Sequence, residues 1–523
     1  MPADIQIKVA KITSVNPATG ELLREFECAN ENDVLFVVNR VRAAQESWAK
    51  IGVRSRIAVL REFQHKLHER KSEVAEAITR EAGKPVAESL TTEVLVVLDA
   101  ARFLMENAYR LLRDEPLPHG SIATKLKSGK LVREPYGVIG IISPWNYPFS
   151  IPATESLAAL VAGNAVVLKP SEFTSLVALE LESLLHAAGV PQDVFQVVVG
   201  DSATGAALIR SQVDKLVFTG SVATGKRIAA SAAEHLLPVV LELGGKDPML
   251  VLDDADVDVA SSAAVWGAFL NAGQTCLSVE RCYVHCSLYE LFLQACAEKT
   301  KKLRVGHGFS PATDMGPLIH ERQVRSVETH VEDALARGAR LLVGGSRLGE
   351  LGTNFYKPTV LADVTHQMRI MREETFGPVL PVAAFEDDDE AVKLANDSEF
   401  GLAASVWTRD RARGERLARR IQASTVMVND VVSCFGISEA PHGGMKSSCI
   451  GRTHGRFGLE EMVRLKYVDT DLMPGMKKVW WYGYGANFAR QMEGLIDTQF
   501  APRIGTRLRG ALLASGMLKR KQL

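Results

Sequence analysis

The chain has 523 residues and contains neither a long apolar run nor an excess of one charge. No stretch reaches the roughly 18 consecutive apolar residues typical of a membrane-spanning helix. The first 26 residues mix charged and apolar side chains and lack the apolar core of a secretory signal peptide. The 61 Lys and Arg residues nearly balance the 62 Asp and Glu residues. Because nucleic-acid binding across a whole chain favours a basic excess, no nucleic-acid partner is expected.

Cysteines are few and odd in number, at positions 28, 276, 282, 286, 296, 434 and 449. An odd set in a large chain is a poor disulfide framework. Cys282 and Cys286 have a metal-like spacing, but no CxxC pair or HxxxH sequence accompanies them, so no metal site is predicted. Reduced thiols are typical of a cytoplasmic protein, which is the location we expect.

The remaining composition, 46% apolar and 24% charged residues, is ordinary for a globular protein. At about 150 residues per domain, the length predicts roughly three domains. Residues 31–112 carry apolar side chains at spacings of three and four with charges between them, which predicts helices. Pro116, Pro118 and Gly120 mark the end of this helical region.

From residue 138 onward, short β-branched runs alternate with helical stretches. The first runs are VIGIISPW, AVVLKP, VFQVVVG, KLVFTGS and PVVLELGG. Alternating strands and helices predict parallel βαβ units in a doubly wound sheet, so the fold class is α/β. A second stretch of the same kind begins near Pro248.

Two segments depart from this α/β pattern. Residues 121–137 alternate without a helical period around Ser128-Gly129, which predicts a hairpin. Residues 474–523 hold nine Lys or Arg residues against Glu493 and Asp497, with two Trp and two Tyr residues within 480–484. We expect this basic, aromatic C-terminal extension to pack on its own chain or on a neighbouring subunit. Peripheral contact with an acidic membrane surface is the less favoured alternative.

Cys276 lies in the segment FLNAGQTCLSVERC, after a predicted helix and a break at Gly273. The small residues before it predict an accessible loop, and a cysteine thiolate is the most nucleophilic side chain available. Most lone cysteines are small core residues, so the local sequence leaves both interpretations open. Cys282 and Cys286 fall in an apolar strand, which favours a structural role.

Glu242 and Asn146 each follow an apolar strand, at the edge where open α/β sheets place their ligands. Glu242, in VVLELGGK, is a candidate general base if partial burial raises its pKa; the alternative is a pairing with the backbone or with Lys246. Asn146, in SPWNYPF, either donates to a developing oxyanion or forms a turn between two prolines.

Further strand ends carry residues suited to a nucleotide. Lys169 and Glu172, in VVLKPSE, suit ribose hydroxyls. Gly220, Ser221 and Gly225, in GSVATG, allow a backbone and a helix N-terminus to approach a pyrophosphate. The positions 146, 169, 220 and 242 together describe one crevice along one sheet edge, which is more specific than any of them alone.

The chain resembles the aldehyde dehydrogenase superfamily from about residue 10 to about residue 470. The motifs that carry the resemblance are PWNYP (144–148), KPSE (169–172), FTGS with Gly225, LELGGK (241–246), GQTC (273–276), EETFGP (373–378) and HGGMKSSCIGR (442–452). Two features depart from the family pattern: His442 stands where Phe is frequent, and Cys449 stands where Gly is usual.

The resemblance implies a catalytic role for three residues. Cys276 would attack the aldehyde carbonyl to form a thiohemiacetal, with the Asn146 amide and the Cys276 N–H holding the oxyanion. Hydride would pass to a nicotinamide and leave a thioester. Glu242 would activate the water that releases the carboxylic acid.

It also implies a set of cofactor-binding residues. Lys169 and Glu172 would hold the adenosine ribose. Gly220, Ser221 and Gly225 would face the pyrophosphate, with Trp145 on the adenine–pyrophosphate side. Glu374 would hold the nicotinamide ribose, and Phe376 would pack against the nicotinamide. Because the Glu172 carboxylate would repel a 2′-phosphate, NAD is the expected cofactor and NADP the alternative.

By the same resemblance, the architecture is a Rossmann-like cofactor-binding domain (1–120 and 138–246), a catalytic α/β domain (247–443) and a small oligomerisation arm (121–137 and 444–473). The hairpin of residues 121–137 would pair with a late strand near 461–471, and this arm would promote a homodimer or homotetramer. The extension 474–523 is outside the resemblance.

Two other functional classes remain as alternatives. One is a non-catalytic relative that keeps the fold as a structural or binding protein, against which Cys276, Glu242 and Asn146 argue. The other is a cysteine hydrolase, for which no histidine adjoins Cys276 in the sequence.

The aldehyde itself is left open between a semialdehyde and an aliphatic or aromatic compound. Arg281 and Arg452 are the candidate partners for the carboxylate of a semialdehyde, although a structural role is favoured for Arg281. The candidate apolar tunnel residues are Tyr147, Trp266, Phe269 and Phe435, which could equally belong to the core.

Overall fold

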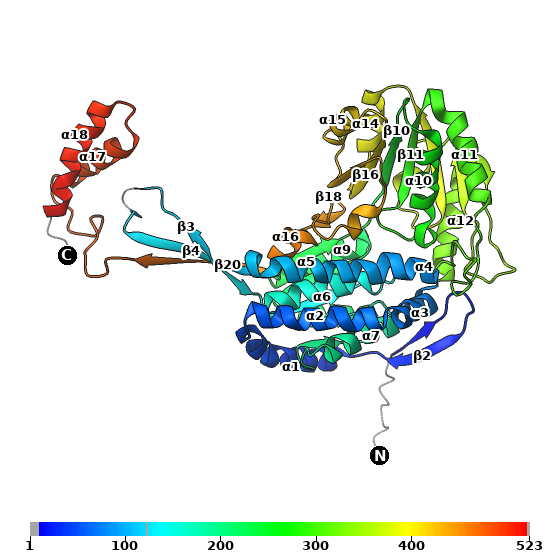
Figure 1. Ribbon diagram of the computed structural model, residues 1–523, viewed down its shortest axis with the longest axis horizontal. Coiled ribbons are helices and arrows are strands. Elements are labelled where there is room, and N and C mark those ends of the chain that lie inside the picture. Colours follow the sequence, from blue (N-terminus) through cyan, green and yellow to red (C-terminus); the bar gives the residue numbers. More distant parts are fainter. Residues whose placement is uncertain (1–9, 122–123, 520–523) are drawn as a thin grey trace, which may run out of the picture. The chain divides into compact units, whose positions relative to one another are not determined.

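The structure of the protein, a computed structural model, describes residues 10–121 and 124–519 (Figure 1). It divides into two compact units, Met1–Leu112 with Pro135–Val463 and Arg113–Glu134 with Arg464–Leu523. Residues 1–9, 122–123 and 520–523, which belong to the predicted cofactor-binding domain, arm and extension, lie outside the described residues.

The helices predicted within residues 31–112 are present. They are α1 (Glu31–Lys50), α2 (Val53–Glu69), α3 (Lys71–Ala82), α4 (Val86–Glu88), the π-helical η1 (Ser89–Val94) and α5 (Leu95–Leu112), preceded by a ribbon of β1 (Lys11–Val15) and β2 (Leu22–Glu27). The start of α1 is fixed by a capping box, in which the Asn30 side chain accepts from the Asp33 N–H and Asp33 accepts from the Asn30 N–H. These helices bury their apolar faces in one core with the first large sheet.

The first large sheet has the strand order β19-β9-β8-β5-β6-β7. Its strands are β5 (Val138–Ile142), β6 (Ala165–Lys169), β7 (Phe195–Val197), β8 (Lys215–Thr219), β9 (Val239–Glu242) and β19 (Cys449–Ile450), and the connecting helices are α6 (Ser150–Ala162), α7 (Ser175–Ala187), α8 (Ser202–Arg210) and α9 (Val222–Glu234). All neighbours are parallel except β19, which pairs antiparallel with β9 and sets Cys449 opposite Glu242. Central strands are buried on both faces, as parallel strands between helical layers must be.

The second large sheet has the strand order β12-β13-β14-β11-β10-β16-β17 and its own core. Its strands are β10 (Asp247–Val251), β11 (Val279–His285), β12 (Arg340–Val343), β13 (Thr359–Ala362), β14 (Val379–Phe385), β16 (Ala403–Trp407) and β17 (Thr425–Val428). The helices around it are α10 (Val257–Phe269), η3 (Leu270–Gly273), η4 (Cys286–Leu288), α11 (Tyr289–Lys301), α12 (Glu321–Ala336), α13 (Arg369–Arg372), α14 (Asp388–Asn396), α15 (Arg411–Ala418) and η5 (Ser433–Gly436). Only β12 runs antiparallel in this sheet.

A small β15 (Phe400–Gly401) and β18 (Met445–Lys446) pair, followed by α16 (Gly455–Glu460), completes the unit. The doubly wound α/β prediction is therefore confirmed for both large sheets.

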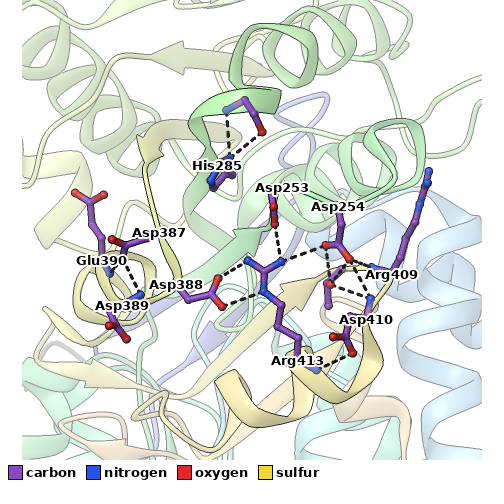
Figure 2. A network of polar contacts seen from close by, with 12 residues as sticks. Asp253, Asp254, His285, Asp387, Asp388, Asp389, Glu390, Arg409, Asp410 and Arg413 are labelled. Carbon is purple, nitrogen blue, oxygen red and sulfur yellow. Dashed lines mark hydrogen bonds and ion pairs between the residues drawn. The ribbon is translucent and has the colours of Figure 1, made fainter.

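The carboxyl edge of the second sheet is closed by ion pairs (Figure 2). Arg413 on α15 reaches Asp388 at the start of α14 with Nε and Nη2, at 2.9 and 2.6 Å, and Asp253 after β10 with Nη1. Asp254 accepts from the Thr408 hydroxyl and from the backbone N–H groups that follow β16. The network ties the ends of β10 and β16 to the first turns of α14 and α15.

The other unit contains a three-stranded sheet in the order β20-β4-β3, built from β3 (Glu115–Leu117), β4 (Lys127–Pro135) and β20 (Val463–Asp471). The hairpin predicted around Ser128-Gly129 is wrong, because β4 runs straight through both residues and pairs instead with β3. Glycine is needed at 129 for packing and not for a turn: a Cβ there would lie 2.8 Å from the side chains of His119 and Tyr467. The late strand expected near 461–471 is β20.

The extension forms α17 (Phe488–Phe500), α18 (Ile504–Ser515) and η6 (Gly516–Lys519). The two helices cross at glycines, since a Cβ on Gly494 would lie 2.7 Å from the Gly510 carbonyl oxygen and one on Gly510 would lie 2.5 Å from the Gly494 carbonyl oxygen. Within residues 10–121 and 124–519, no helix is both long and apolar enough to cross a membrane.

Candidate active site

The candidate residues come from opposite ends of the two large sheets. The first sheet contributes its carboxyl edge, with Asn146 after β5, Lys169 at the end of β6, Gly220 after β8 and Glu242 at the end of β9. The second sheet contributes its amino edge, because Cys276 lies just before β11 and Glu374 just before β14. The crevice predicted along one edge of the first sheet is therefore completed by two loops that lead into strands of the second sheet.

A pocket of about 320 Å³ brings seven of the predicted residues together. These are Trp145, Asn146, Gly220, Ser221, Cys276, Glu374 and Phe376. The other four predicted residues, Lys169, Glu172, Gly225 and Glu242, are not part of its lining.

The loop that carries Cys276 has an unusual backbone. Asn271, Ala272 and Gly273 have φ values of 53°, 55° and 75°, a left-handed run in which only glycine is free of strain. On its far side, a Cβ on Gly245 would lie 2.3 Å from the Cys276 carbonyl oxygen. The nucleophile loop is thus pressed against Gly245, whereas a Cβ on Gly244 would lie 2.4 Å from the Glu374 carboxylate, so the two glycines of LELGGK make room for two different groups.

Asn146 is tied to this loop by side-chain hydrogen bonds. Its Nδ2 donates to the Gln274 carbonyl at 3.0 Å, and the Asn271 Nδ2 donates to the Asn146 carbonyl at 2.9 Å. The neighbouring Tyr147 hydroxyl lies 2.7 Å from the Thr275 Oγ1. One hydrogen of the Asn146 amide is left for another acceptor beside Cys276.

A buried ion pair that sequence reasoning missed supports the Asn146 loop. Lys84 and Glu93 have no exposed side-chain surface and form an ion pair of 2.6 Å. Lys84 also donates to the Asn146 carbonyl at 2.8 Å, while Glu93 accepts the N–H groups of Phe149 and Ser150 at the start of α6. Neither residue belongs to a motif, so the sequence offered no signal for them.

Burial raises the pKa of the Cys276 thiol, and the nearby carboxyl groups of Asp247, Glu374 and Glu242 raise it further. The resting side chain is therefore a thiol, and it needs a base to become a nucleophile. A cysteine held protonated in a polar pocket differs from Cys282 and Cys296, which lie fully inside the core of the second sheet.

Glu242 is 4% exposed, and burial raises its pKa to about 8. Its Oε1 accepts from the Thr453 hydroxyl at 3.4 Å, whereas its Oε2 has no hydrogen-bond partner among the described residues. The nearest ring nitrogen is the Nε2 of His442, at 3.9 Å. The alternative pairing with Lys246 is wrong, because Lys246 forms a buried ion pair with Glu280.

The two departures from the family pattern both adjoin Glu242. Cys449 lies opposite it in the β9–β19 pair, and its thiol opposes the rise in the Glu242 pKa. The His442 ring packs edge-on against Phe435, with centroids 5.0 Å apart. Burial lowers the pKa of His442 to about 3, so the ring is neutral at physiological pH.

Lys169 and Glu172 lie together near the end of β6. Lys169 is 4% exposed, and burial lowers its pKa against the attraction of Glu172 and Asp201. Its Nζ donates to no described residue. An ammonium group on a largely buried side chain, without a described hydrogen-bond partner and beside a carboxylate, fits the hydroxyl groups of a ribose.

Ser221 caps α9, with its Oγ accepting from the Thr224 N–H. Gly220 precedes it and donates its N–H to the Glu242 carbonyl, so the two residues just before a 13-residue helix line the pocket. A Cβ on Gly225 would lie 2.5 Å from Leu243, which makes this glycine a packing residue between α9 and the strand end. The helix N-terminus fits an anionic diphosphate.

Glu374 and Phe376 come from the loop before β14. Burial raises the pKa of Glu374 to about 8, and its Oε1 accepts from the Gly245 N–H at 3.0 Å. Phe376 meets Trp145 edge-on at 5.4 Å. The loop is held by Glu280, which sequence reasoning also missed and which accepts the Phe376 N–H at 2.8 Å.

Among the candidate substrate contacts, the two arginines bond to backbone carbonyls, whereas two of the apolar residues line a pocket. Arg281 is fully buried and donates to the carbonyls of Lys246, Leu394 and Ala395, so it is structural. Arg452 donates to the Gly451 carbonyl. Trp266 and Phe269 line a second pocket of about 310 Å³ beside Leu270, at the start of the nucleophile loop.

Within the described part of the chain, no group of three or more His, Cys, Asp or Glu side chains could hold a metal ion, and all seven cysteines are free.

The sequence model of the aldehyde dehydrogenase family matches residues 6–468. Among characterised relatives, a 4,4'-diapolycopene aldehyde oxidase of Methylomonas sp is 40% identical over 486 residues, covering 93% of this chain and 91% of the relative. A mitochondrial succinate-semialdehyde dehydrogenase of Oryza sativa subsp. japonica is 37% identical over 455 residues, covering 87% and 85%. A 486-residue match within this chain must reach at least residue 486, and so it enters the C-terminal extension.

Solved structures agree with these relatives. An NAD-dependent aldehyde dehydrogenase from Sinorhizobium meliloti is 36% identical with a TM-score of 0.86, covering 90% of this chain and 93% of that one. A succinate-semialdehyde dehydrogenase from Burkholderia pseudomallei is 37% identical with a TM-score of 0.84, covering 88% and 95%.

Proposed function

Since this chain belongs to the aldehyde dehydrogenase family, an NAD(P)-dependent oxidoreductase family, we propose that it oxidises an aldehyde through a covalent intermediate on Cys276. The observation that carries the proposal is the position of Cys276 in one pocket with Asn146, Glu374 and the N-terminus of α9. The Cys276 thiol gives up its proton to solvent water, and the resulting thiolate attacks the aldehyde carbonyl carbon to form a thiohemiacetal whose oxygen carries the negative charge. A tetrahedral carbon bearing an oxyanion can then expel a hydride, which a carbonyl carbon cannot.

Asn146 stabilises the oxyanion of this intermediate together with the Cys276 N–H. The amide has a hydrogen to spare after its bond to Gln274, and the Lys84–Glu93 pair holds the loop that presents it. Donors fixed in advance cost no reorganisation when the charge develops.

Glu242 supplies the base for the second half of the reaction. As a carboxylate, it removes a proton from water while the oxygen attacks the Cys276 thioester, and the carboxylic acid leaves as the thiol is restored. Its raised pKa, about 8, makes it a stronger base than an exposed glutamate.

NAD, when bound, accepts the hydride. Lys169 and Glu172 would hold its adenosine ribose, Gly220 and Ser221 its diphosphate, and Glu374 the nicotinamide ribose. Trp145 and Phe376 supply the aromatic wall, and Gly225 lets α9 approach the strand end. We prefer NAD to NADP because Glu172 would repel a 2′-phosphate. Glu172→Gln is expected to raise kcat/KM with NADP by about tenfold; an unchanged NAD/NADP ratio would remove Glu172 from this role.

An apolar aldehyde is the substrate class that we propose. The pocket lined by Trp266 and Phe269 is mostly apolar, and its two carboxyl groups are already engaged, Asp314 with Arg304 and Glu88 with the Asn271 N–H. Its one cationic residue, Lys299, is already bonded to Asp258. The Methylomonas relative, named for a diapolycopene aldehyde, supports this choice. Succinic semialdehyde is the second candidate, because the relatives from rice and Burkholderia are named for it.

The first test is NADH formation with a panel of aldehydes, using the full chain and Cys276→Ser. We expect long aliphatic or aromatic aldehydes to be oxidised faster than succinic semialdehyde, and the variant to be inactive. Silence with every aldehyde, with NAD and with NADP, would favour the non-catalytic alternative. Turnover of an activated ester without any cofactor-dependent oxidation would favour the hydrolase alternative.

The assembly and its location complete the proposal. The two separate cores support a cofactor-binding domain (1–120 and 138–246) and a catalytic domain (247–443). The β20-β4-β3 sheet supports an arm that joins two or four copies, because its outer strands, β3 and β20, lie at the edges of a small sheet. Seven free cysteines support a cytoplasmic location.

A further inference from the structure

Helix α18 presents an apolar face to solvent. Ile504, Leu508 and Leu512 are 75%, 64% and 76% exposed, and their spacing of four places them in one stripe. A row of exposed large apolar side chains is unusual on a globular surface and marks an interaction site.

The opposite face of α18 is already used. Gly510 packs on Gly494 of α17, and the close crossing of the two backbones fixes which side of α18 faces its neighbour. Met517, just beyond the helix, is buried. The exposed stripe is therefore a second face and does not belong to the α17–α18 contact.

Arginines flank the stripe. Neighbouring residues of an α-helix are about 100° apart, so Arg507 and Arg509 lie on either side of Leu508. Arg503 precedes the helix, and all three arginines are exposed. Residues 474–523 carry nine Lys or Arg residues against two acidic ones, whereas the whole chain is close to neutral.

The same extension carries exposed aromatic side chains. Trp480, Trp481, Tyr482 and Tyr484, in the segment before α17, are 37%, 47%, 73% and 56% exposed. Tryptophan and tyrosine are the residues that prefer the level of lipid headgroups.

We propose that α18 docks on an anionic lipid bilayer, lying in the interface with Ile504, Leu508 and Leu512 toward the acyl chains and the arginines toward lipid phosphates. The combination of an apolar stripe, flanking arginines and aromatic residues matches a membrane surface in both polarity and charge. The contact is peripheral, because no described helix is long and apolar enough to span. The proposal reverses the order of the two possibilities that the sequence suggested for this extension.

The test is co-sedimentation of the full-length enzyme with vesicles of phosphatidylcholine alone or mixed with phosphatidylglycerol, at low and high salt. We expect binding to the mixed vesicles, weakened by salt. Leu508→Glu should weaken it at least tenfold by placing a charge in the stripe. Replacing Arg503, Arg507 and Arg509 together by Gln should weaken it by about 100-fold.

The matched control is Leu291→Glu, an exposed leucine on α11 that is 61% exposed. It should bind vesicles as the unaltered chain does. All variants should retain activity on a water-soluble aldehyde, which separates loss of docking from loss of folding and from failure of the proposed enzymatic function.

Failure of the unaltered chain to sediment with mixed vesicles would overturn the proposal. So would equal sedimentation of Leu508→Glu. If instead Leu508→Glu changes the oligomeric state in analytical ultracentrifugation and vesicle binding is absent, the stripe contacts a second copy of the chain and the proposal is wrong.

Discussion

The carboxyl edges of the two large sheets occupy the same topological position and have opposite characters. At the edge of the second sheet, Arg413 forms ion pairs with both Asp253 and Asp388 (Figure 2). At the edge of the first sheet, Glu242 has an oxygen with no described partner, and Lys169 is buried without a hydrogen bond.

The difference between the two edges shows which of them can hold reactive groups. Polar groups in folded proteins are normally satisfied, and those at the second edge are paired although they are partly exposed to water. Polar groups without a hydrogen-bond partner keep a shifted pKa and can still bond a substrate or a cofactor. An active site requires both properties. The second sheet contributes to the site through its opposite, amino edge, where Cys276 and Glu374 lie.

The largest effect should come from the first edge. Glu242→Gln keeps the shape of the side chain but removes the base, so steady-state oxidation should fall by about 10³-fold. The first turnover of NADH should persist, because hydride transfer precedes the step that Glu242 assists. Rapid-mixing measurements of NADH would show this burst. Glu390→Gln, at the second edge, is the control and should leave both phases unchanged; loss of the burst would place Glu242 earlier in the reaction.

Arg413→Met tests the second edge. Removing the guanidinium leaves the partly exposed Asp253 and Asp388 without their shared partner, so the free energy of unfolding should fall by about 1 kcal/mol, with kcat unchanged. Urea unfolding with a parallel kinetic assay measures both. Arg416→Met, an exposed residue on the same helix, should change neither. A lower kcat for Arg413→Met at full stability would show that the two edges are coupled.

The pH dependence of stability should separate the edges as well. Burial raises the pKa of Glu155, beside the first edge, from 4.5 to about 8. Between these values the folded state holds a proton that the unfolded state releases, so stability falls as pH rises through that interval. Glu155→Gln should reduce the slope and raise the unfolding free energy at pH 8 by at least about 1 kcal/mol. Thermal unfolding across pH would reveal it, with the exposed Glu234→Gln as control; an unaltered slope would assign the effect to other buried carboxyls.

The smallest effect should come from His442→Phe, which installs the residue frequent in the family. The neutral ring at 3.9 Å is a weak polar neighbour of Glu242, and its loss makes the carboxylate harder to ionise. The midpoint of the pH profile for steady-state oxidation, expected near the Glu242 pKa of about 8, should rise by about half a unit. Phe435→Leu alters packing on the same ring without changing its proton chemistry and should leave the midpoint in place. Superimposable profiles would mean that His442 only fills space.

The sequence predicted the parts of the molecule that repeat a local pattern. Apolar periodicity identified the helices of residues 31–112 and the parallel strands, and the motifs located Asn146 after a strand and Cys276 in a loop after a helix. These signals are local, because each depends on a few neighbouring residues.

Interactions between distant segments could not be predicted. Glu280 holds the loop of Phe376, and Lys84 reaches Asn146, across 96 and 62 positions of chain. No spacing rule connects such residues. The prediction of a hairpin at Ser128-Gly129 was wrong for the same reason. Gly129 is required by its close packing against Tyr467, which lies on a strand far along the chain.

The left-handed run before Cys276 has a consequence for the history of the sequence. Selection for stability alone would place glycine at 272, where alanine costs about 1 kcal/mol or more of backbone strain. A glycine would also widen the range of positions open to the thiol. Alanine at this position therefore lowers the stability of the protein but restricts the loop to fewer conformations. A screen for thermostable variants would favour glycine at 272 and would so make the loop of Cys276 less rigid.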